Sequence, residues 1–245
     1  KASSLALQGD VAAFKQLRDS HTKFSNDLGR LTAGGELFEM SVPPSPDSAQ
    51  PQLQALTKTW EKTDKNALQL LEMEKNLVAL GRSVQKINED NAQLLDLSEQ
   101  VIALKLQTNA GARDIVSASQ LVMLTQRIAK NASALLVGDE IGPEIVFLLG
   151  KDTYTFRELL TGLAKGSEAL RITASSDPET KRKLAELEDI FKEFQKEVSD
   201  ILASVQKLTL AKQAGSRIFR DSEALLEATD TLAAAYQGNT AERAL

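Results

Sequence analysis

The chain has 245 residues, of which 42% are hydrophobic and only 4% aromatic, so it can bury a core but has the composition of a helical bundle rather than a β-sandwich. Its formal net charge is −5 and acidic residues are spread among the basic ones, which argues against a nucleic-acid-binding surface. The absence of cysteine excludes disulfides, thiol catalysis and cysteine-held metals. The sequence contains no apolar run long enough to cross a bilayer.

Apolar residues spaced three and four apart predict an all-α chain of long helices. The expected helices cover residues 10–31, 53–71, 77–106, 113–137, 144–173, 178–202 and 208–236. Asp10 is one expected N-cap, and either Ser176 or Asp177 is another, followed by Pro178 at the first helical position. Apolar and polar residues do not alternate for long enough anywhere to predict a strand.

Glycine, proline and asparagine mark the expected breaks between these helices. Four prolines in residues 36–51 rule out a helix there and predict a loop. A turn is expected near residues 73–76, and Gly238 with Asn239 is expected to close the last helix. Residues 108–111 predict a further break, with one continuous helix across them as the alternative.

The apolar pattern repeats within the chain. The matched pairs are Phe14–Phe156, Leu17–Leu159 and Leu28–Leu170 at an offset of 142, and Leu53–Leu184, Trp60–Phe191, Ile87–Ile218, Leu94–Leu225 and Leu95–Leu226 at an offset of 131. The offsets differ by 11 residues, which a single insertion explains, namely the proline-rich loop of the first copy. We therefore expect tandem antiparallel four-helix bundles, with a first repeat over residues 1–108 and a second over residues 109–245.

The first repeat has no counterpart of the helix predicted over residues 113–137. That counterpart is expected upstream of Lys1, with a similar Gln-Arg-Ile-Ala-Lys segment. Because three helices bury too little apolar surface by themselves, the first repeat is expected to take a fourth helix from elsewhere. The possible sources are the upstream segment, a partner subunit and the second repeat.

Residues that could carry catalysis are nearly missing. The sequence contains no HExxH, no Ser-His-Asp set, no Walker A loop and no GxGxxG. The one histidine, His21, lies on a polar helix face and is expected to be exposed to solvent. Trp60 lies at helical spacing and is expected in the core rather than in a binding site. We therefore expect no enzyme, no metal site and no cofactor.

The helix predicted over residues 113–137 carries a second stripe that is mostly polar, formed by Ser117, Gln120, Leu124, Arg127 and Asn131. One interpretation is an arginine that snorkels at the edge of the core among polar neighbours. The other is a strip of hydrogen-bond donors that meets a ligand or the same helix of a second subunit. The candidate binding residues under the second interpretation are Gln120, Gln126, Arg127, Lys130 and Asn131.

Arg127 has no carboxylate within reach on its own helix. The positions three and four residues away hold Met123, Leu124, Lys130 and Asn131. Since a guanidinium is always charged and offers five donors, it needs an acceptor elsewhere. The alternatives are a carboxylate on a neighbouring helix, a partner subunit and a bound anion or carboxylate ligand.

Residues 123–132, MLTQRIAKNA, resemble the RMLSQRIAKNA signature of the PilJ family, which comprises periplasmic sensor domains of type IV pilus chemotaxis-like transducers. That family is distantly similar to the NarX nitrate sensor. The chain departs from the signature at Val122, where the family usually has arginine, and this departure counts against an anion as the ligand.

The resemblance implies a ligand- or protein-sensing ectodomain of a transmembrane transducer that controls type IV pilus twitching motility. It implies a periplasmic location, as part of a bacterial inner-membrane protein whose flanking membrane helices lie outside this chain. The implied partners are a second copy of the intact protein, as a homodimer, and pilin, another periplasmic protein or a small anion as the signal. The alternative is a structural or scaffold helical bundle without a ligand, and the coding sequence on both sides of the chain distinguishes the two.

Overall fold

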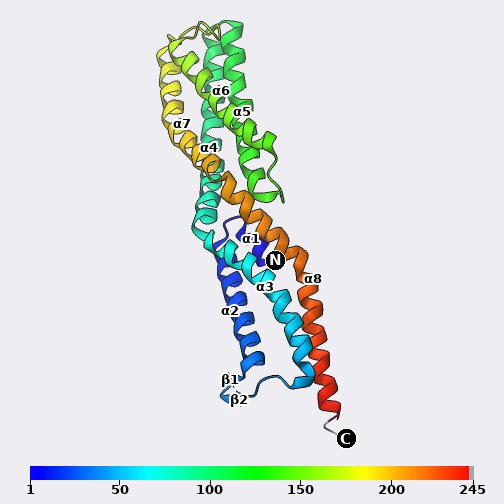
Figure 1. The fold of residues 1–245 in the computed structure, drawn as a ribbon. Coiled ribbons are helices and arrows are strands. Elements are labelled where there is room, and N and C mark those ends of the chain that lie inside the picture. Colours follow the sequence, from blue (N-terminus) through cyan, green and yellow to red (C-terminus); the bar gives the residue numbers. More distant parts are fainter. Residues whose placement is uncertain (243–245) are drawn as a thin grey trace. The chain divides into compact units, whose positions relative to one another are not determined.

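The structure, a computed structural model, describes residues 1–242, with side chains up to residue 238, and consists mostly of long helices (Figure 1). The elements are α1 (Ala2–Ala6), α2 (Val11–Ala33), β1 (Gly35–Leu37), β2 (Met40–Val42), the 3-10 helix η1 (Asp47–Ala49), α3 (Gln50–Glu72), α4 (Glu74–Gln107), α5 (Ala112–Val137), α6 (Pro143–Lys165), α7 (Pro178–Ala203) and α8 (Val205–Glu242). The predicted all-α class, built from long helices packed in antiparallel bundles, is confirmed.

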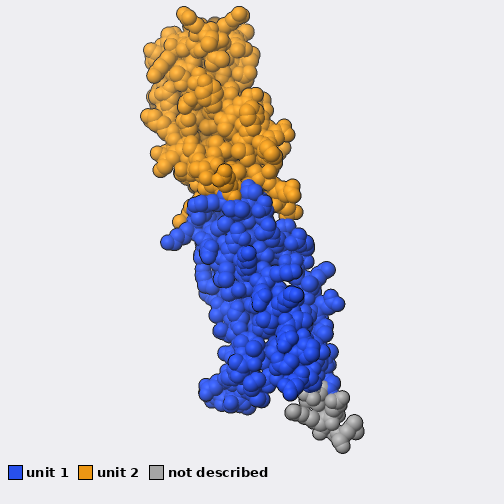
Figure 2. Space-filling view, in the orientation of Figure 1, with its two compact units in different colours: residues 1–78, 207–245 blue, residues 79–206 orange. Residues whose placement is uncertain are grey.

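The chain forms two compact units, which Figure 2 shows in different colours. Unit 1 contains residues 1–78 and the chain from residue 207 onward, and unit 2 contains residues 79–206. Unit 1 therefore holds α1, α2, α3 and most of α8, while unit 2 holds α5, α6, α7 and most of α4. The predicted boundary between residues 108 and 109 separates two repeats in the sequence, whereas these units are defined by contacts in space. The units therefore do not test that boundary, which stays a prediction.

Most helix ends lie where the sequence predicted them. Met73 alone separates α3 from α4, and a break over residues 108–111 separates α4 from α5. Two predicted ends are wrong. Helix α6 ends at Lys165 rather than near residue 173, because Gly166 has a left-handed φ of 84° and the chain then turns into a short backbone bridge. Helix α8 continues past residues 238–239, since a glycine costs only about 1 kcal/mol in a helix and an asparagine costs less, so the two together do not have to end it.

The two helices with predicted N-caps both have one. The carboxylate of Asp10 accepts a hydrogen bond from the backbone N–H of Ala13 at 3.0 Å. Asp177, rather than Ser176, caps α7 and accepts from the backbone N–H of Thr180 at 2.9 Å. That hydrogen bond, with a second one from the Thr180 hydroxyl, lowers the pKa of Asp177. The capping carboxylate therefore stays ionised near neutral pH, where it satisfies a free N–H at the start of the helix.

The loop predicted for residues 36–51 contains a β-hairpin that the sequence pattern did not indicate. Strands β1 and β2 are antiparallel, with Gly35 opposite Val42. The two turn residues, Phe38 and Glu39, have φ values of 49° and 62°, a left-handed conformation that glycine or asparagine adopts with much less strain. Strands of three residues are too short to produce a detectable alternation, which explains why the hairpin was missed.

Replacing Phe38 by Asn and Glu39 by Gly is expected to stabilise this hairpin by about 1 kcal/mol, because Asn-Gly adopts two positive φ angles with little strain. The side chain of Phe38 is exposed, so its removal loses little packing. Hydrogen exchange of the backbone amides over residues 35–42 measures the effect. As a matched control, Glu36→Asn with Met40→Gly, at exposed strand positions, should speed exchange. Faster exchange in the Asn-Gly variant would contradict the turn geometry.

Unit 1 has its core where α2, α3 and α8 meet. The buried members of this cluster are Leu28, Ala49, Leu53, Leu56 and Leu232. Trp60 packs against the cluster, and its ring centroid lies 4.2 Å from that of Phe24. The interpretation of Trp60 as a core residue is therefore correct, and its helical spacing was a sufficient signal.

The expectation that His21 is exposed to solvent is wrong. Its side chain is largely buried, its ring lies 5.6 Å from that of Trp60, and its Nε2 atom is hydrogen-bonded to Asp64 of α3. The polar face on which His21 lies is covered by a facing helix that supplies both an aromatic ring and a carboxylate. Helical spacing within α2 alone carries no information on that facing helix.

Unit 2 has its core among α4, α5, α6 and α7. The rings of Phe156 and Phe191 stack with their centroids 4.7 Å apart, and Phe194 lies 6.1 Å from Phe191. The predicted apolar stripe of α5 is also buried, and its members are Leu121, Leu124, Ile128 and Leu135. This core fixes the face that α5 turns inward and thereby places the polar stripe of the same helix.

Candidate functional site

Helix α5 carries the candidate site and packs mainly against α6. It begins after Gly111, and Asp114 in its first turn places a negative charge at the positive end of the helix dipole. With the apolar stripe turned inward, the polar stripe lies along the boundaries between α5 and its neighbours. Each polar side chain of the stripe can therefore contact a neighbouring helix or solvent at those boundaries.

Arg127 forms a bidentate ion pair with Asp152 of α6. Its Nε atom donates to Oδ2 and its Nη2 atom to Oδ1, each at 2.5 Å. The side chain of Asp152 is only 1% exposed, whereas that of Arg127 is 41% exposed. The hydrogen bond to Asp152 raises the pKa of Arg127, so the guanidinium stays protonated at any relevant pH. The acceptor that α5 itself lacks is thus a carboxylate on a neighbouring helix, one of the three alternatives that the sequence left open.

The other four candidate residues divide between two environments. Gln126 and Lys130 are exposed to solvent, while Gln120 and Asn131 are half-buried. The Nδ2 atom of Asn131 is buried without a hydrogen-bond partner among the described residues. The structure therefore places Arg127 in an ion pair and Asn131 at the edge of the core, and the binding role of all five residues stays a prediction.

Helix α4 contributes polar residues to the core of unit 2 that the sequence analysis did not single out. Asp90 is buried, and its Oδ1 atom accepts a hydrogen bond from Lys86 at 2.8 Å. Its Oδ2 atom and the Oδ1 atom of the adjoining Asn91 are buried without a partner among the described residues. An aspartate and an asparagine between the apolar residues of this helix were the signal that could have identified them.

This part of α4 lies beside the second half of α5. The amide of Asn88 donates to the hydroxyl of Ser133 at 3.3 Å, two residues from Asn131. We use the term polar layer for Asp90, Asn91 and Asn131. A buried polar atom without a partner costs about 1–3 kcal/mol, so the polar layer weakens the packing of unit 2 at this level.

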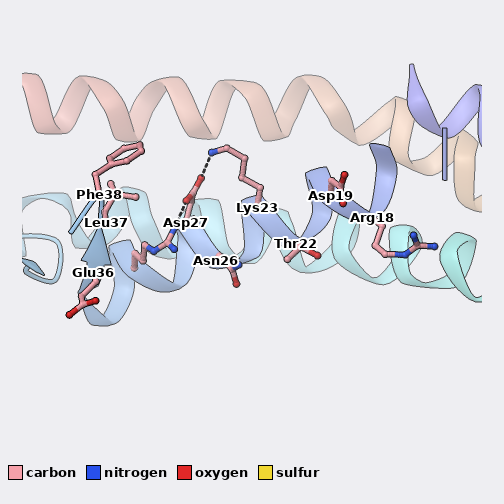
Figure 3. A pocket seen from close by; sticks show the side chains of 10 residues that line it. Arg18, Asp19, Thr22, Lys23, Asn26, Asp27, Glu36, Leu37 and Phe38 are labelled. Atoms are coloured by element: carbon pink, nitrogen blue, oxygen red, sulfur yellow. Dashed lines mark hydrogen bonds and ion pairs between the residues drawn. The ribbon is translucent and has the colours of Figure 1, made fainter. Parts of the chain in front are cut away.

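Unit 1 has an open surface pocket of about 610 Å³ along α2 (Figure 3). Its three basic residues each hold a carboxylate. Asp27 accepts hydrogen bonds from Lys23 and Arg30, each at 2.9 Å, and the bond from Lys23 lowers the pKa of Asp27. Arg18, at the other end of the pocket, pairs with Glu74. Because these three cations already hold carboxylates, the pocket is a poor site for an anion.

A buried lysine in the last turn of α4 lies beside Asp114 of α5, and Asp114 also contacts the loop that follows α6. The side chain of Lys105 is buried, with its ammonium group 3.9 Å from a carboxylate oxygen of Asp114. Asp114 also accepts a hydrogen bond from the backbone N–H of Thr173 at 3.2 Å. Burial lowers the pKa of Lys105, although the negative charges of Asp114 and Asp177 act in the opposite direction.

This lowered pKa predicts that stability increases at alkaline pH. The unfolded chain holds the Lys105 proton more tightly than the folded chain, so stability is gained as the pH rises from the folded pKa towards the unfolded value of 10.5. Urea unfolding at several pH values between about 8 and 10.5 measures the gain. Lys105→Met should remove it, and Lys181→Met, at an exposed lysine, should retain it. If the free energy of unfolding changes with pH in the same way for the parent chain and for Lys105→Met, the prediction is contradicted.

Two kinds of feature are absent from the described residues, a metal-binding cluster and a membrane span. Among the side chains of residues 1–238, no three or more of His, Cys, Asp or Glu come together in a way that could hold a metal ion. None of the helices in that range combines the length and the apolar character of a transmembrane segment.

Known proteins resemble the chain along most of its length. Residues 1–85 and 106–216 match the family described as type IV pili methyl-accepting chemotaxis transducer N-term, a range that includes all of α5. The whole chain is 27% identical to Protein PilJ of Pseudomonas aeruginosa and covers 36% of that protein. Over 236 residues, 96% of the chain, it is also 27% identical to AlkN of Alcanivorax borkumensis, a protein named for methyl-accepting chemotaxis, of which it covers 33%.

The chain spans about a third of the length of these two relatives. The family match covers well over half of the chain and contains the MLTQRIAKNA segment on which the sequence resemblance was based. The chain belongs to the PilJ family, the N-terminal domain of type IV pili methyl-accepting chemotaxis transducers.

Proposed function

We propose that this chain is the sensory part of a longer transducer, that it lies in the periplasm as part of a bacterial inner-membrane protein, and that it controls type IV pilus twitching motility. The family match over residues 1–85 and 106–216 is the observation that carries this proposal. The two relatives are about three times as long as the chain, which leaves room for a part that passes the signal on. In this proposal the chain binds and transmits, and it catalyses no reaction.

The polar layer supports a mechanism in which α5 changes its position against its neighbours. Packed helices have discrete arrangements, and a polar layer that is only partly hydrogen-bonded reduces the free-energy difference between them. A signal that binds one arrangement more tightly shifts the population by its difference in affinity. Asn131 lies on the same side of α5 as Arg127, one turn further along, so a movement of α5 changes the surroundings of both residues.

A protein partner fits this geometry better than a small anion. An anion at Arg127 has to compete with the buried carboxylate of Asp152, which already makes two hydrogen bonds at 2.5 Å. The pocket along α2 offers no better site, because its cations are paired with carboxylates. We therefore favour pilin or another periplasmic protein as the signal, with the intact transducer acting as a homodimer, as chemoreceptor-like proteins do.

Asn131→Leu in the full-length transducer tests the proposal. Ser119→Ala is the control, because Ser119 is exposed on the same helix and is not one of the candidate binding residues. Removing the unpaired amide should raise the stability of the 245-residue chain by about 1 kcal/mol and favour one packing of α5. Twitching motility should then change while the amount of transducer stays the same, whereas Ser119→Ala should leave both the stability of the chain and twitching motility unchanged. If Asn131→Leu stabilises the chain and twitching motility stays at the parental level, the chain acts as a passive structural spacer and the proposal fails.

A further inference from the structure

Helix α8 presents two large apolar side chains to solvent on one side. Phe219 is 78% exposed and Leu226 is 62% exposed, and a spacing of seven residues places them two turns apart on the same side. A different side of α8, which includes Leu225 and Leu232, packs into the core of unit 1. Both exposed residues lie beyond residue 216, where the family match ends.

A third exposed apolar residue lies nearby, at the start of α2. Val11 is 58% exposed. Leu7, four residues before Val11, lies against Gly215, four residues before Phe219, so closely that a Cβ atom on Gly215 would be 2.8 Å from the Leu7 side chain. The start of α2 and this part of α8 are therefore neighbours in unit 1. We use the term open apolar face for Val11, Phe219 and Leu226.

In unit 2, the position that corresponds to Val11 is covered by α5. At the repeat offset of 142 residues, Val11 matches Thr153, which is only 5% exposed. The adjoining Asp152 holds Arg127 of α5, so α5 lies over this part of α6. The same position is thus buried in unit 2 and open in unit 1.

The position that corresponds to Phe219 also lies beside α5. At the offset of 131 residues, Phe219 matches Asn88, whose amide is hydrogen-bonded to Ser133 of α5. Leu226 matches Leu95, which is half-buried. In unit 2, α5 therefore lies beside α4 and α6 at or next to the positions that match Phe219 and Val11, both of which are exposed in unit 1.

We propose that the open apolar face is the docking surface for one more amphipathic helix of the same polypeptide, which precedes Lys1 in the longer protein and completes unit 1 as α5 completes unit 2. In unit 2 the covering helix directly precedes α6, and the repeat equates α6 with the segment that contains α1 and α2. The corresponding helix in unit 1 therefore directly precedes α1. About two-thirds of the length of each of these two relatives lies outside the matched region, so both contain sequence beyond that of the chain.

The number of helices in unit 1 supports this occupant. A bundle of three helices leaves one apolar stripe without a partner, and a fourth amphipathic helix closes the core. In the 245-residue chain, α1 is too short to fill this role, since it spans only Ala2–Ala6. The covering helix is expected to carry apolar residues three and four apart that pack on Phe219 and Leu226. The same surface could instead hold a second copy of the chain, and the experiment separates the two cases.

The test uses thiol labelling, because the chain has no cysteine of its own. Ser222→Cys places a reporter between Phe219 and Leu226 with little change in side-chain size. The reporter is labelled with a maleimide in two chains, the 245-residue chain and the same chain extended upstream by as many native residues as α5 and its link to α6 contain. Ala224→Cys is the control, since Ala224 is exposed on α8 but points well away from Phe219 around the helix.

The proposal predicts that Ser222→Cys is labelled at least about tenfold more slowly in the extended chain, at every protein concentration, while Ala224→Cys is labelled equally in both chains. Phe219→Asp in the extended chain should restore fast labelling of Ser222→Cys. The same substitution should leave the melting curve of the 245-residue chain unchanged, because Phe219 is exposed there. Equal labelling of Ser222→Cys in both chains overturns the proposal. Protection that is already present in the 245-residue chain and grows with protein concentration overturns it too, because a second copy is then the occupant.

Discussion

Replacing Arg127 by methionine is expected to lower the free energy of unfolding by about 2–3 kcal/mol. Asp152 is buried, and Arg127 donates to both of its carboxylate oxygens. Without the guanidinium, a negative charge remains in the interior with its main partner removed. The expected loss is below that of a fully buried pair, because the side chain of Arg127 is 41% exposed and water already solvates part of its charge.

Urea unfolding of a double-mutant cycle measures this effect. Asp152→Leu should cost less than Arg127→Met, because the arginine can turn its charge towards solvent whereas the aspartate cannot. The double variant should recover most of the loss, since two apolar side chains then replace the pair. Lys130→Met, at an exposed lysine three residues away, should stay within about 0.5 kcal/mol of the parent chain. A similarly small change for Arg127→Met would show that its guanidinium is free for a ligand.

Replacing Phe156 by alanine is expected to lower the free energy of unfolding by about 3–5 kcal/mol. The side chain is fully buried and stacks on Phe191, so the substitution leaves a cavity in the aromatic core of unit 2. Phe147→Ala is the matched control, because Phe147 lies on the same helix and is exposed. Thermal unfolding followed by circular dichroism compares the two variants. Equal losses would contradict the burial of Phe156.

The repeat-related position in unit 1 extends this comparison. Phe14 matches Phe156 at the offset of 142 residues and is also fully buried. Phe14→Ala is therefore expected to be about as costly as Phe156→Ala. A much smaller loss would show that the two positions are not equivalent in packing and would weaken the argument from the internal repeat.

The helices show why part of this structure could be read from the chain. The stripe of Leu121, Leu124 and Ile128 is buried as predicted, because apolar spacing along a helix directly marks the face that avoids water. The hairpin and the end of α6 could not be read in this way. Their conformations depend on left-handed residues at Phe38, Glu39 and Gly166, of which only the glycine is of a type that suggests such a turn.

The candidate site was predictable only in part. The sequence showed that Arg127 needs an acceptor outside α5, because no carboxylate lies three or four residues away. It could not show that the acceptor is Asp152, since the pairing depends on how α6 is rotated against α5. The same applies to His21 with Asp64 and to the atoms of the polar layer, whose environments are set by facing helices.

The sequence by itself determined the all-α class, the positions of most helices and the family resemblance of residues 123–132, because each of these follows from local spacing or local identity. The tertiary structure alone decided that α8 joins α1, α2 and α3 in one compact unit, although well over a hundred residues separate them along the chain. It also decided which buried charges are paired and which polar atoms are left without partners. The physical reason is that such pairings depend on the orientation of one helix against another, and the apolar period of a single helix does not specify its neighbour.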